Sequence, residues 1–188
     1  MATDEQIARR LQQGDRAALT ELVERHYDLL LGYLYRLARG DRSLAQDLTQ
    51  ETFLRALRGI TGYQYPRPFK PWLYAIATNL ARNHYTRADT RHTDSVDEDT
   101  EYGADDPPDA ALLERDQVQA EAQTVIAALD RLPDHQREVI VLYFYQSLPL
   151  QAIAETLAIP LGTVKSRLSI GMKRLREQIK ALDDVSER

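Results

Sequence analysis

The chain has 188 residues, 43% of them hydrophobic and none of them cysteine. This length and apolar content suit one medium domain or two small ones with real cores, and the lack of cysteine excludes disulfides, thiolate nucleophiles and Cys-ligated zinc sites. The net charge of −5 is uneven, because residues 1–88 carry 13 basic and 9 acidic side chains (net +4), residues 89–116 carry 2 and 11 (net −9), and residues 117–188 carry 9 of each.

Helical periodicity runs through most of the sequence, which predicts an all-α protein with two small helical domains joined by a flexible acidic linker. The first domain, residues 1–88, should contain four helices. We expect them near Asp4–Gln13, after a cap at Asp15, over about Ser43–Leu57, and after a Gly-, Tyr- and Pro-rich loop, ending near Arg87. The second helix should bury a leucine-rich side: Leu19, Leu22, Val23, Leu29, Leu30, Tyr33, Leu34 and Leu37. The fourth should bury Trp72, Leu73, Ile76, Ala77 and Leu80.

Residues 89–107 are rich in Asp and Glu and poor in large apolar groups, so they bury too little surface to offset the entropy of ordering. We expect a flexible linker there. The second domain, residues 108–188, should begin with a helix after Pro107-Pro108 that runs through Leu129. Residues 139–144 could pass for a strand, but they continue the helix that starts after Pro133, and two more helices should follow.

Residues 150–168 read as a helix-turn-helix. Six apolar residues have the spacing that packs two short helices across a tight turn: Ile153, Ala154, Leu157, Ile159, Val164 and Leu168. The open face of the second helix then carries Thr163, Lys165, Ser166 and Arg167. Hydroxyls and a lysine at a helix N-terminus suit phosphates, and an arginine can pair with a guanine edge in the major groove. Residues 162–180 hold six basic side chains against Glu177 alone, a local charge of +5. The alternative is an ordinary amphipathic hairpin with solvated cations.

Two carboxylates lie four residues apart on the helix expected at 44–57. Asp47 and Glu51 share one face with Gln50 between them, a like-charge spacing that disfavours an isolated helix by about 0.2–0.5 kcal/mol. A basic partner protein would relieve this repulsion. The alternatives are a solvated face, with Arg55 partly compensating Glu51, and an acid/base pair, for which no His, Cys or Ser motif is present.

Aromatic, amide and basic groups alternate over residues 63–85. Asn79 and Asn83 share one helical face beside Arg82, whereas Trp72 is expected in the core. Aromatic rings and amides near basic groups can stack on an unpaired base and recognise its edge. Tyr63, Tyr65 and Phe69 suit either this role or the core.

The sequence contains no Gly-rich phosphate loop, HExxH or GxSxG pattern, and its four histidines lack ligand spacing. We therefore expect no enzyme activity, no cofactor and no metal. No apolar run approaches the roughly 20 residues that span a bilayer, and the N-terminus has no signal-peptide pattern, so we expect a cytoplasmic protein without membrane insertion.

The order of these motifs resembles that of the extracytoplasmic-function (ECF) sigma factors, of the sigma-70 family. Residues 47–53 are similar to the family's helix that binds core RNA polymerase, residues 72–79 to the helix behind its −10 pocket, and residues 162–168 to its −35 recognition helix. The resemblance implies core-polymerase contacts at Asp47, Gln50, Glu51, Phe53 and Leu54. It implies single-stranded −10 contacts at Tyr63, Tyr65, Arg67, Asn79, Arg82 and Asn83, and duplex −35 contacts at Thr163, Lys165, Ser166, Arg167, Lys173 and Arg174. It also implies an anti-sigma factor as a partner.

Two departures from the family pattern affect the site. The loop from Gly59 to Pro71 is longer than usual, which leaves open whether Tyr63 or Tyr65 borders the base pocket. Pro149 and Ala152 stand where the family often has a helix capping box. The second hypothesis is a dimeric helix-turn-helix regulator that reads a palindrome without the polymerase.

Overall fold

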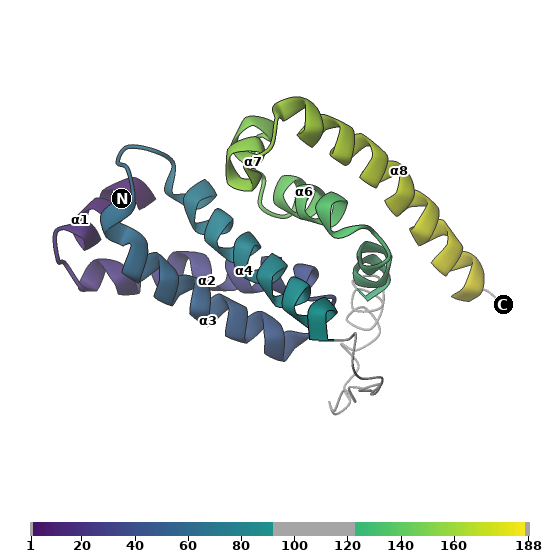
Figure 1. Cartoon of the computed structure of the whole chain (residues 1–188), viewed down its shortest axis with the longest axis horizontal. Coiled ribbons are helices and arrows are strands. Elements are labelled where there is room, and N and C mark those ends of the chain that lie inside the picture. Colours follow the sequence, from purple (N-terminus) through teal and green to yellow (C-terminus); the bar gives the residue numbers. More distant parts are fainter. Residues whose placement is uncertain (1, 92–122, 187–188) are drawn as a thin grey trace, which may run out of the picture.

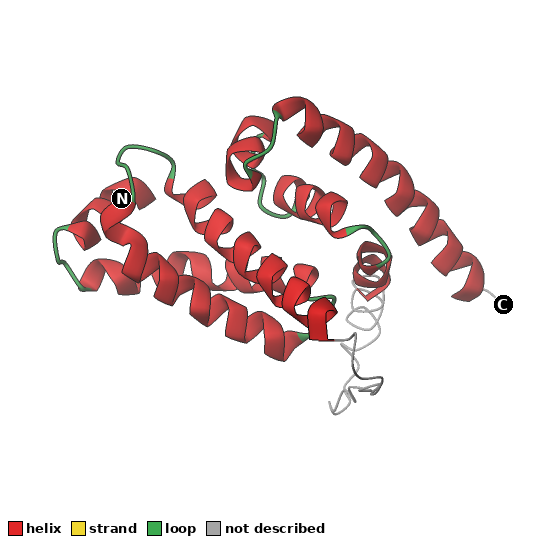
Figure 2. Ribbon diagram, in the orientation of Figure 1, coloured by secondary structure: helices red, strands yellow, loops and turns green. Residues whose placement is uncertain are grey.

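A computed structural model describes residues 2–91 and 123–186 of the chain. Within these ranges every regular element is a helix and none is a strand, which confirms the predicted all-α class (Figure 2). The helices form two groups, with α1 to α4 on one side and α6 to α8 on the other (Figure 1). Their bounds are α1 (Asp4–Gln12), α2 (Ala17–Leu37), α3 (Arg42–Gly59), the short 3-10 helix η1 (Ile60–Gly62), α4 (Phe69–Arg91), α6 (Asp134–Phe144), α7 (Leu150–Leu157) and α8 (Leu161–Ser186).

The first group is a four-helix unit, and its helix order matches the prediction. Two of its helices start at side-chain caps: Thr3 and Gln6 form a capping box on α1, and Asp41 accepts a hydrogen bond from the Leu44 amide at the start of α3. The predicted cap of α2 at Asp15 lies one residue too early. Arg16 is the N-cap, although the Asp15 carboxylate accepts from the Ala17 amide at 3.0 Å.

The core of this unit contains most of the residues predicted for it. Leu22, Leu30, Tyr33, Leu34 and Leu37 of α2 are buried, as are Leu73, Ala77 and Leu80 of α4. Trp72 and Ile76 are partly buried and pack against the core. The prediction for Leu29 was wrong, because this side chain is 48% exposed. Leu29 precedes the buried Leu30, and one step around a helix is enough to turn a side chain away from the core.

The end of the first unit differs from the expectation. Helix α4 continues to Arg91, four residues beyond the predicted end near Arg87, so it includes the first residues of the predicted 89–107 linker. The rest of that linker and the expected helix start at Pro107-Pro108 lie outside the described residues. The described remainder of that helix, over 123–130, is helical and buries Leu129.

The second group packs around α6, which is helical through residues 139–144 as predicted. All seven residues from 136 to 142 are buried, so every side of α6 faces protein. Helix α8 approaches it closely at Gly171, where a Cβ would lie 2.8 Å from Ile140 Cδ1. None of the described helices is both long and apolar enough to cross a bilayer.

Candidate protein and nucleic-acid interfaces

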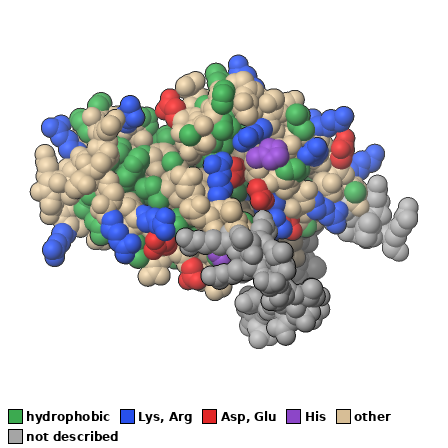
Figure 3. Space-filling model, in the orientation of Figure 1, with side chains coloured by type: hydrophobic (Ala, Val, Ile, Leu, Met, Phe, Trp, Pro, Cys, Tyr) green, Lys and Arg blue, Asp and Glu red, His purple; other side chains and the backbone are tan. Residues whose placement is uncertain are grey.

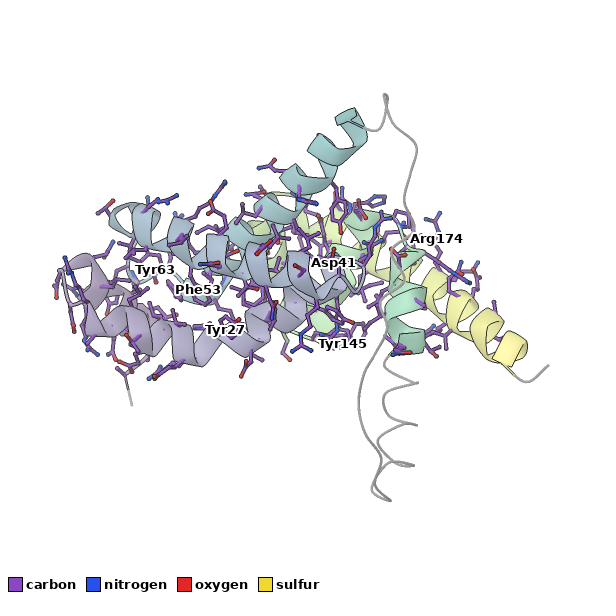
Figure 4. All side chains as sticks on the ribbon, turned by 90° about the horizontal axis from the view of Figure 1, so that it is seen from below. Tyr27, Asp41, Phe53, Tyr63, Tyr145 and Arg174 are labelled. Atoms are coloured by element: carbon purple, nitrogen blue, oxygen red, sulfur yellow. The ribbon has the colours of Figure 1, made fainter. Side chains whose placement is uncertain are left out.

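An apolar groove lies on the outer face of the first unit, between α2 and α3. It is lined by Leu19, Val23, Tyr27, Phe53, Leu54 and Leu57, together with the polar side chains of Gln46, Asp47 and Gln50. Figure 4 shows Tyr27 of α2 and Phe53 of α3 on this face. The structure thus brings together four residues that the sequence proposed as polymerase contacts, namely Asp47, Gln50, Phe53 and Leu54.

The groove also contains residues that sequence reasoning placed elsewhere or missed. Leu19 and Val23 were assigned to the core, but they are only partly buried and line the groove. Tyr27 and Leu57 were not singled out, and each is 38% exposed. A patch of large apolar side chains on a surface is typical of a binding site, and acidic and amide groups beside it favour a basic partner.

Glu51 differs from its neighbour Asp47 in having a partner within the helix. The Arg55 Nε donates to Glu51 Oε1 at 2.7 Å, and this hydrogen bond lowers the pKa of Glu51. The compensation of Glu51 by Arg55 is therefore confirmed. Asp47 is exposed, so its charge is the more available of the two.

The loop before α4 is held in place by α1. Gln12 Nε2 donates to the carbonyls of Ile60 and Tyr63, both at 2.7 Å, and Glu5 accepts from the Phe69 amide at the start of α4. Gln12 and Glu5 were not identified from the sequence, because these contacts join residues about fifty or more positions apart and no local sequence pattern predicts them.

The two tyrosines of this loop have different environments. Tyr63 is only 4% exposed, packs against Phe69 and Trp72, and donates its hydroxyl to the Arg67 carbonyl; burial raises its pKa to about 12. Tyr65 is 42% exposed, and the Arg9 guanidinium lies 4.7 Å from the centre of its ring. Of the two, Tyr65 is the more exposed ring, and Arg9 lies against one of its faces.

Helix α4 carries the amides proposed for base recognition. Asn79 and Asn83 are exposed, and they lie one helical turn apart beside Arg82. Arg82 is not available in this arrangement, because it forms two hydrogen bonds with Glu138 of α6, at 2.7 and 2.6 Å.

The predicted helix-turn-helix is formed by α7 and the start of α8. Ala158 adopts the left-handed conformation (φ 53°), and the Ile159 amide donates to the Ala154 carbonyl, which closes the turn. Ile153, Ala154, Leu157 and Val164 are buried between the two helices. Pro149 is the N-cap of α7 and provides no side-chain cap, in line with the missing capping box.

The proposed DNA-reading residues lie within residues 163–174 of α8. Lys165, Ser166 and Lys173 are exposed, whereas Thr163 and Arg167 are half-buried. Lys and Arg side chains follow α8 on the face seen in Figure 3. Arg174 is exposed but also contacts α6, since its Nη1 donates to Gln136 Oε1 at 3.3 Å. Helix α8 carries these basic side chains and directly follows the tight turn after α7. A helix-turn-helix of this arrangement is the kind whose second helix inserts into a DNA major groove.

Comparisons with known proteins agree with this geometry. The family model of sigma-70 region 2 matches residues 22–91, and that of sigma-70 region 4 matches residues 128–177. The RNA polymerase sigma-H factor of Pseudomonas aeruginosa is 35% identical over 97% of this chain and 95% of its own length. The chain belongs to the ECF sigma factors of the sigma-70 family.

Other relatives extend the comparison. This sigma factor is 34% identical to the ECF sigma factor SigW of Bacillus subtilis, over 93% of the chain and 95% of the relative. It is 37% identical to SigE of Mycolicibacterium smegmatis, over 88% of the chain but only 64% of that longer protein. Among solved structures, CnrH in complex with the cytosolic domain of CnrY is similar with a TM-score of 0.65 and 25% identity, over 97% of each chain.

Proposed function

We propose that this sigma factor binds core RNA polymerase, directs it to promoters and captures an unpaired −10 base as the DNA opens. In this proposal residues 1–88 bind the polymerase and the −10 element, residues 108–188 read the duplex −35 element through α8, and residues 89–107 connect them. The protein acts as an initiation factor in the cytoplasm and not as an enzyme.

The groove between α2 and α3 is the observation that carries the proposal. A helix-turn-helix alone is common to many regulators, but a separate apolar groove beside Asp47 and Gln50 gives the chain a second, protein-binding surface far along the sequence from α8. A dimeric regulator could use such a groove to join its two copies, so the match to region 2 separates the two functions. That match covers all of α3 and α2 from Leu22 onward.

We assign the site residues accordingly. The polymerase contacts are Asp47, Gln50, Glu51, Phe53 and Leu54, to which the groove adds Tyr27 and Leu57. The −10 contacts are Tyr65, Arg67, Asn79, Arg82 and Asn83, with Tyr63 supporting the loop from beneath. The −35 contacts are Thr163, Lys165, Ser166, Arg167, Lys173 and Arg174.

The proposed partners include an anti-sigma factor. The similar structure of CnrH was solved with the cytosolic domain of CnrY, and that of RpoE from Bartonella quintana, 24% identical with a TM-score of 0.71, was solved with the anti-sigma factor NepR. The second likeness supports the fold alone, and the first supports a protein partner of this kind.

Reconstitution tests the function directly. Purified chain is mixed with core polymerase and genomic DNA fragments, and run-off transcripts are mapped to their promoters. We expect promoter-specific transcripts that require both components. Protection of a palindrome by the chain alone, without core-dependent transcription, would instead support the dimeric regulator.

A further inference from the structure

Helix α1 lies beside the loop that joins α3 to α4, residues 60–68, which carries the proposed −10 residues Tyr65 and Arg67 (Figure 1). The helix lines neither the polymerase groove nor the face of α8 that carries the basic side chains. It contacts the loop near both loop ends and at the loop's centre.

Gln12 holds the first part of the loop. Its side-chain Nε2 donates to the Ile60 carbonyl and to the Tyr63 carbonyl, each at 2.7 Å. Because both partners are acceptors, the NH2 end of the amide must face the loop. One side chain therefore satisfies two backbone carbonyls and sets the distance between α1 and the segment that leads to Tyr65.

Glu5 holds the far end of the loop, where α4 begins. Its Oε1 accepts from the backbone amide of Phe69 at 3.1 Å. This amide belongs to the first turn of α4, whose amides have no carbonyl partner within the helix. A carboxylate at a helix N-terminus also interacts favourably with the helix dipole. Glu5 thus fixes the point at which the loop enters α4.

Arg9 contacts the centre of the loop. Its guanidinium lies 4.7 Å from the centre of the Tyr65 ring, which is within the range of cation–π attraction. Glu5, Arg9 and Gln12 follow one another at spacings of four and three residues, and this spacing places them on one face of a helix. A single face of α1 therefore contacts the loop from end to end.

Another side of α1 is fixed to the rest of the first unit. Ile7 and Leu11 are buried in its core. The Asp4 carboxylate lies 3.1 Å from the Arg25 guanidinium and 2.9 Å from the imidazole of His26, both on α2. Because α1 is anchored in this way, it can hold the loop in place instead of moving with it.

The internal hydrogen bonds of the loop shape its tip without fixing where the tip lies. The Arg67 amide donates to the Gln64 carbonyl at 2.8 Å, and the Tyr63 hydroxyl donates to the Arg67 carbonyl. Both bonds join loop residues to each other, so they would be kept if the loop moved as a body. A recognition site is precise only when contacts from its surroundings hold its side chains near the productive geometry.

We propose that α1 positions this loop for the single-stranded −10 element, with Gln12 as the main positioning residue. Gln12 does not touch DNA; it acts through the two carbonyls that it holds, which fix the segment leading to Tyr65 and Arg67. Loss of these bonds should lower the affinity for the −10 strand and leave polymerase binding intact, since α1 contributes no residue to the groove. The inference rests on the function proposed above, because it assigns the loop to the −10 strand.

Two substitutions at Gln12 remove the donor, and two at its neighbour control for them. Gln12→Glu replaces the NH2 group by a carboxylate oxygen that repels both carbonyls. Gln12→Met keeps the length of the side chain without donor or charge, in case the first variant disturbs folding. Gln13→Glu and Gln13→Met are the matched controls, because Gln13 is the adjacent residue at the same end of α1 and is exposed.

Binding of holoenzyme to −10 DNA measures the positioning. Holoenzyme assembled with each variant is titrated with a fluorescent single-stranded oligonucleotide that carries the −10 sequence of a promoter mapped by run-off transcription. Both Gln12 variants should bind it about tenfold more weakly than the wild type, the loss expected when the loop occupies its binding conformation only about one time in ten. Both Gln13 variants should bind it like the wild type. All four should bind core polymerase with wild-type affinity.

The fluorescence of Trp72 reports the placement of the loop separately from DNA binding. Trp72 is the only tryptophan of the chain, and its ring centre lies 5.4 Å from that of Tyr63. Displacement of Tyr63 in the Gln12 variants should open the Trp72 ring to solvent and increase its quenching by acrylamide in the free chain, whereas the Gln13 variants should show wild-type quenching. A residue that only stabilised the fold would lower the melting temperature without changing the quenching or the −10 affinity of the folded protein.

These measurements separate failure of the inference from failure of the proposed function. Equal −10 affinities of the Gln12 and Gln13 variants, beside a wild type that binds the oligonucleotide, would overturn the positioning role alone. Loss of −10 affinity with an equal loss of core binding in both Gln12 variants would also overturn it, because the whole unit would then be disturbed. Wild-type holoenzyme that binds the oligonucleotide no better than core polymerase does would overturn the −10 function together with the inference.

Discussion

The basic side chains of α8 should not act alike on DNA. We propose that Arg167 pairs with one base, so Arg167→Ala should cost about 1–3 kcal/mol at one −35 position and relax the preference there. Lys165→Ala should weaken binding to all sequences and reduce the salt slope by about one. Binding of holoenzyme to a set of single-base −35 variants, at several salt concentrations, checks both. Uniform loss with Arg167→Ala would show that this residue contacts only phosphate.

His26 should make stability depend on pH. Burial lowers the pKa of this imidazole, although Asp4 lies 2.9 Å away and opposes the shift. A His pKa depressed in the folded state gives stability that is complete above the unfolded value of about 6.5 and is lost as the pH falls below it. Between pH 7.5 and 5.5, the melting temperature of His26→Leu should therefore fall less than that of the wild type. The control His84→Leu, at an exposed histidine, should keep the wild-type slope; an equal slope for His26→Leu would contradict the account.

Single residues show where sequence reasoning reaches its limit. The face shared by Asn79 and Asn83 follows from helical spacing alone, and both are exposed as that spacing implied. Helical spacing could not decide whether Tyr63 or Tyr65 borders the base pocket, because the answer depends on Phe69 and Trp72 packing around Tyr63. The pairing of Arg82 with Glu138, 56 residues away, depends on the contact between the two units and has no local signal.

At the scale of the helix, α3 should bind the polymerase through its acidic face. Asp47→Arg with Glu51→Arg should abolish co-purification with core polymerase, because two charges reverse beside the apolar groove. Both side chains point away from the core, so circular dichroism should remain helical. The variant Arg42→Glu, at an exposed position that helical spacing places on another side of α3 from Asp47 and Glu51, is the control for charge change alone. Retained co-purification of the first variant would remove α3 from the interface.

Helix α6 should be held by Arg137. Its guanidinium is 1% exposed and donates to the carbonyls of Leu129, Asp130 and Leu132 at 2.8, 2.8 and 2.9 Å. Arg137→Met should leave these carbonyls without donors and lower the free energy of unfolding by at least about 2 kcal/mol. The control Arg131→Met, at an exposed arginine, should change it by less than about 0.5 kcal/mol. Urea unfolding measures the free energy of unfolding of both variants. Equal losses in the two variants would show that the buried hydrogen bonds of Arg137 do not stabilise the fold.

The sequence predicted where the helices lie along the chain better than it predicted which of their faces are buried. The starts of α6 and α8 follow from Pro133 and from the helix-turn-helix spacing. The burial of α6 on all sides was not predictable, since Gln136, Arg137 and Glu138 would suit a solvated face in an isolated domain. Contacts with the first unit, with residues 129–132 and with α8 bury them.

At the scale of the whole molecule, the acidic excess of the sequence lies between the two units, because residues 89–116 carry a net charge of −9 whereas residues 117–188 carry equal numbers of basic and acidic side chains. The contacts of Arg82 and Arg39 with carboxylates of the second unit accompany apolar packing, since buried apolar side chains of both units belong to one core cluster.

The most direct test of the account is promoter melting by holoenzyme, measured as permanganate reactivity of the −10 thymines. Unstacking a base costs a few kcal/mol, which stacking and amide hydrogen bonds can recover. Asn79→Ala and Asn83→Ala should each reduce this reactivity on duplex promoters while keeping core binding and the melting temperature of the free protein. A template with a pre-melted −10 bubble should partly restore it. Unchanged reactivity on duplex DNA, or a lowered melting temperature without rescue by the bubble, would contradict the assignment of this face to the −10 strand.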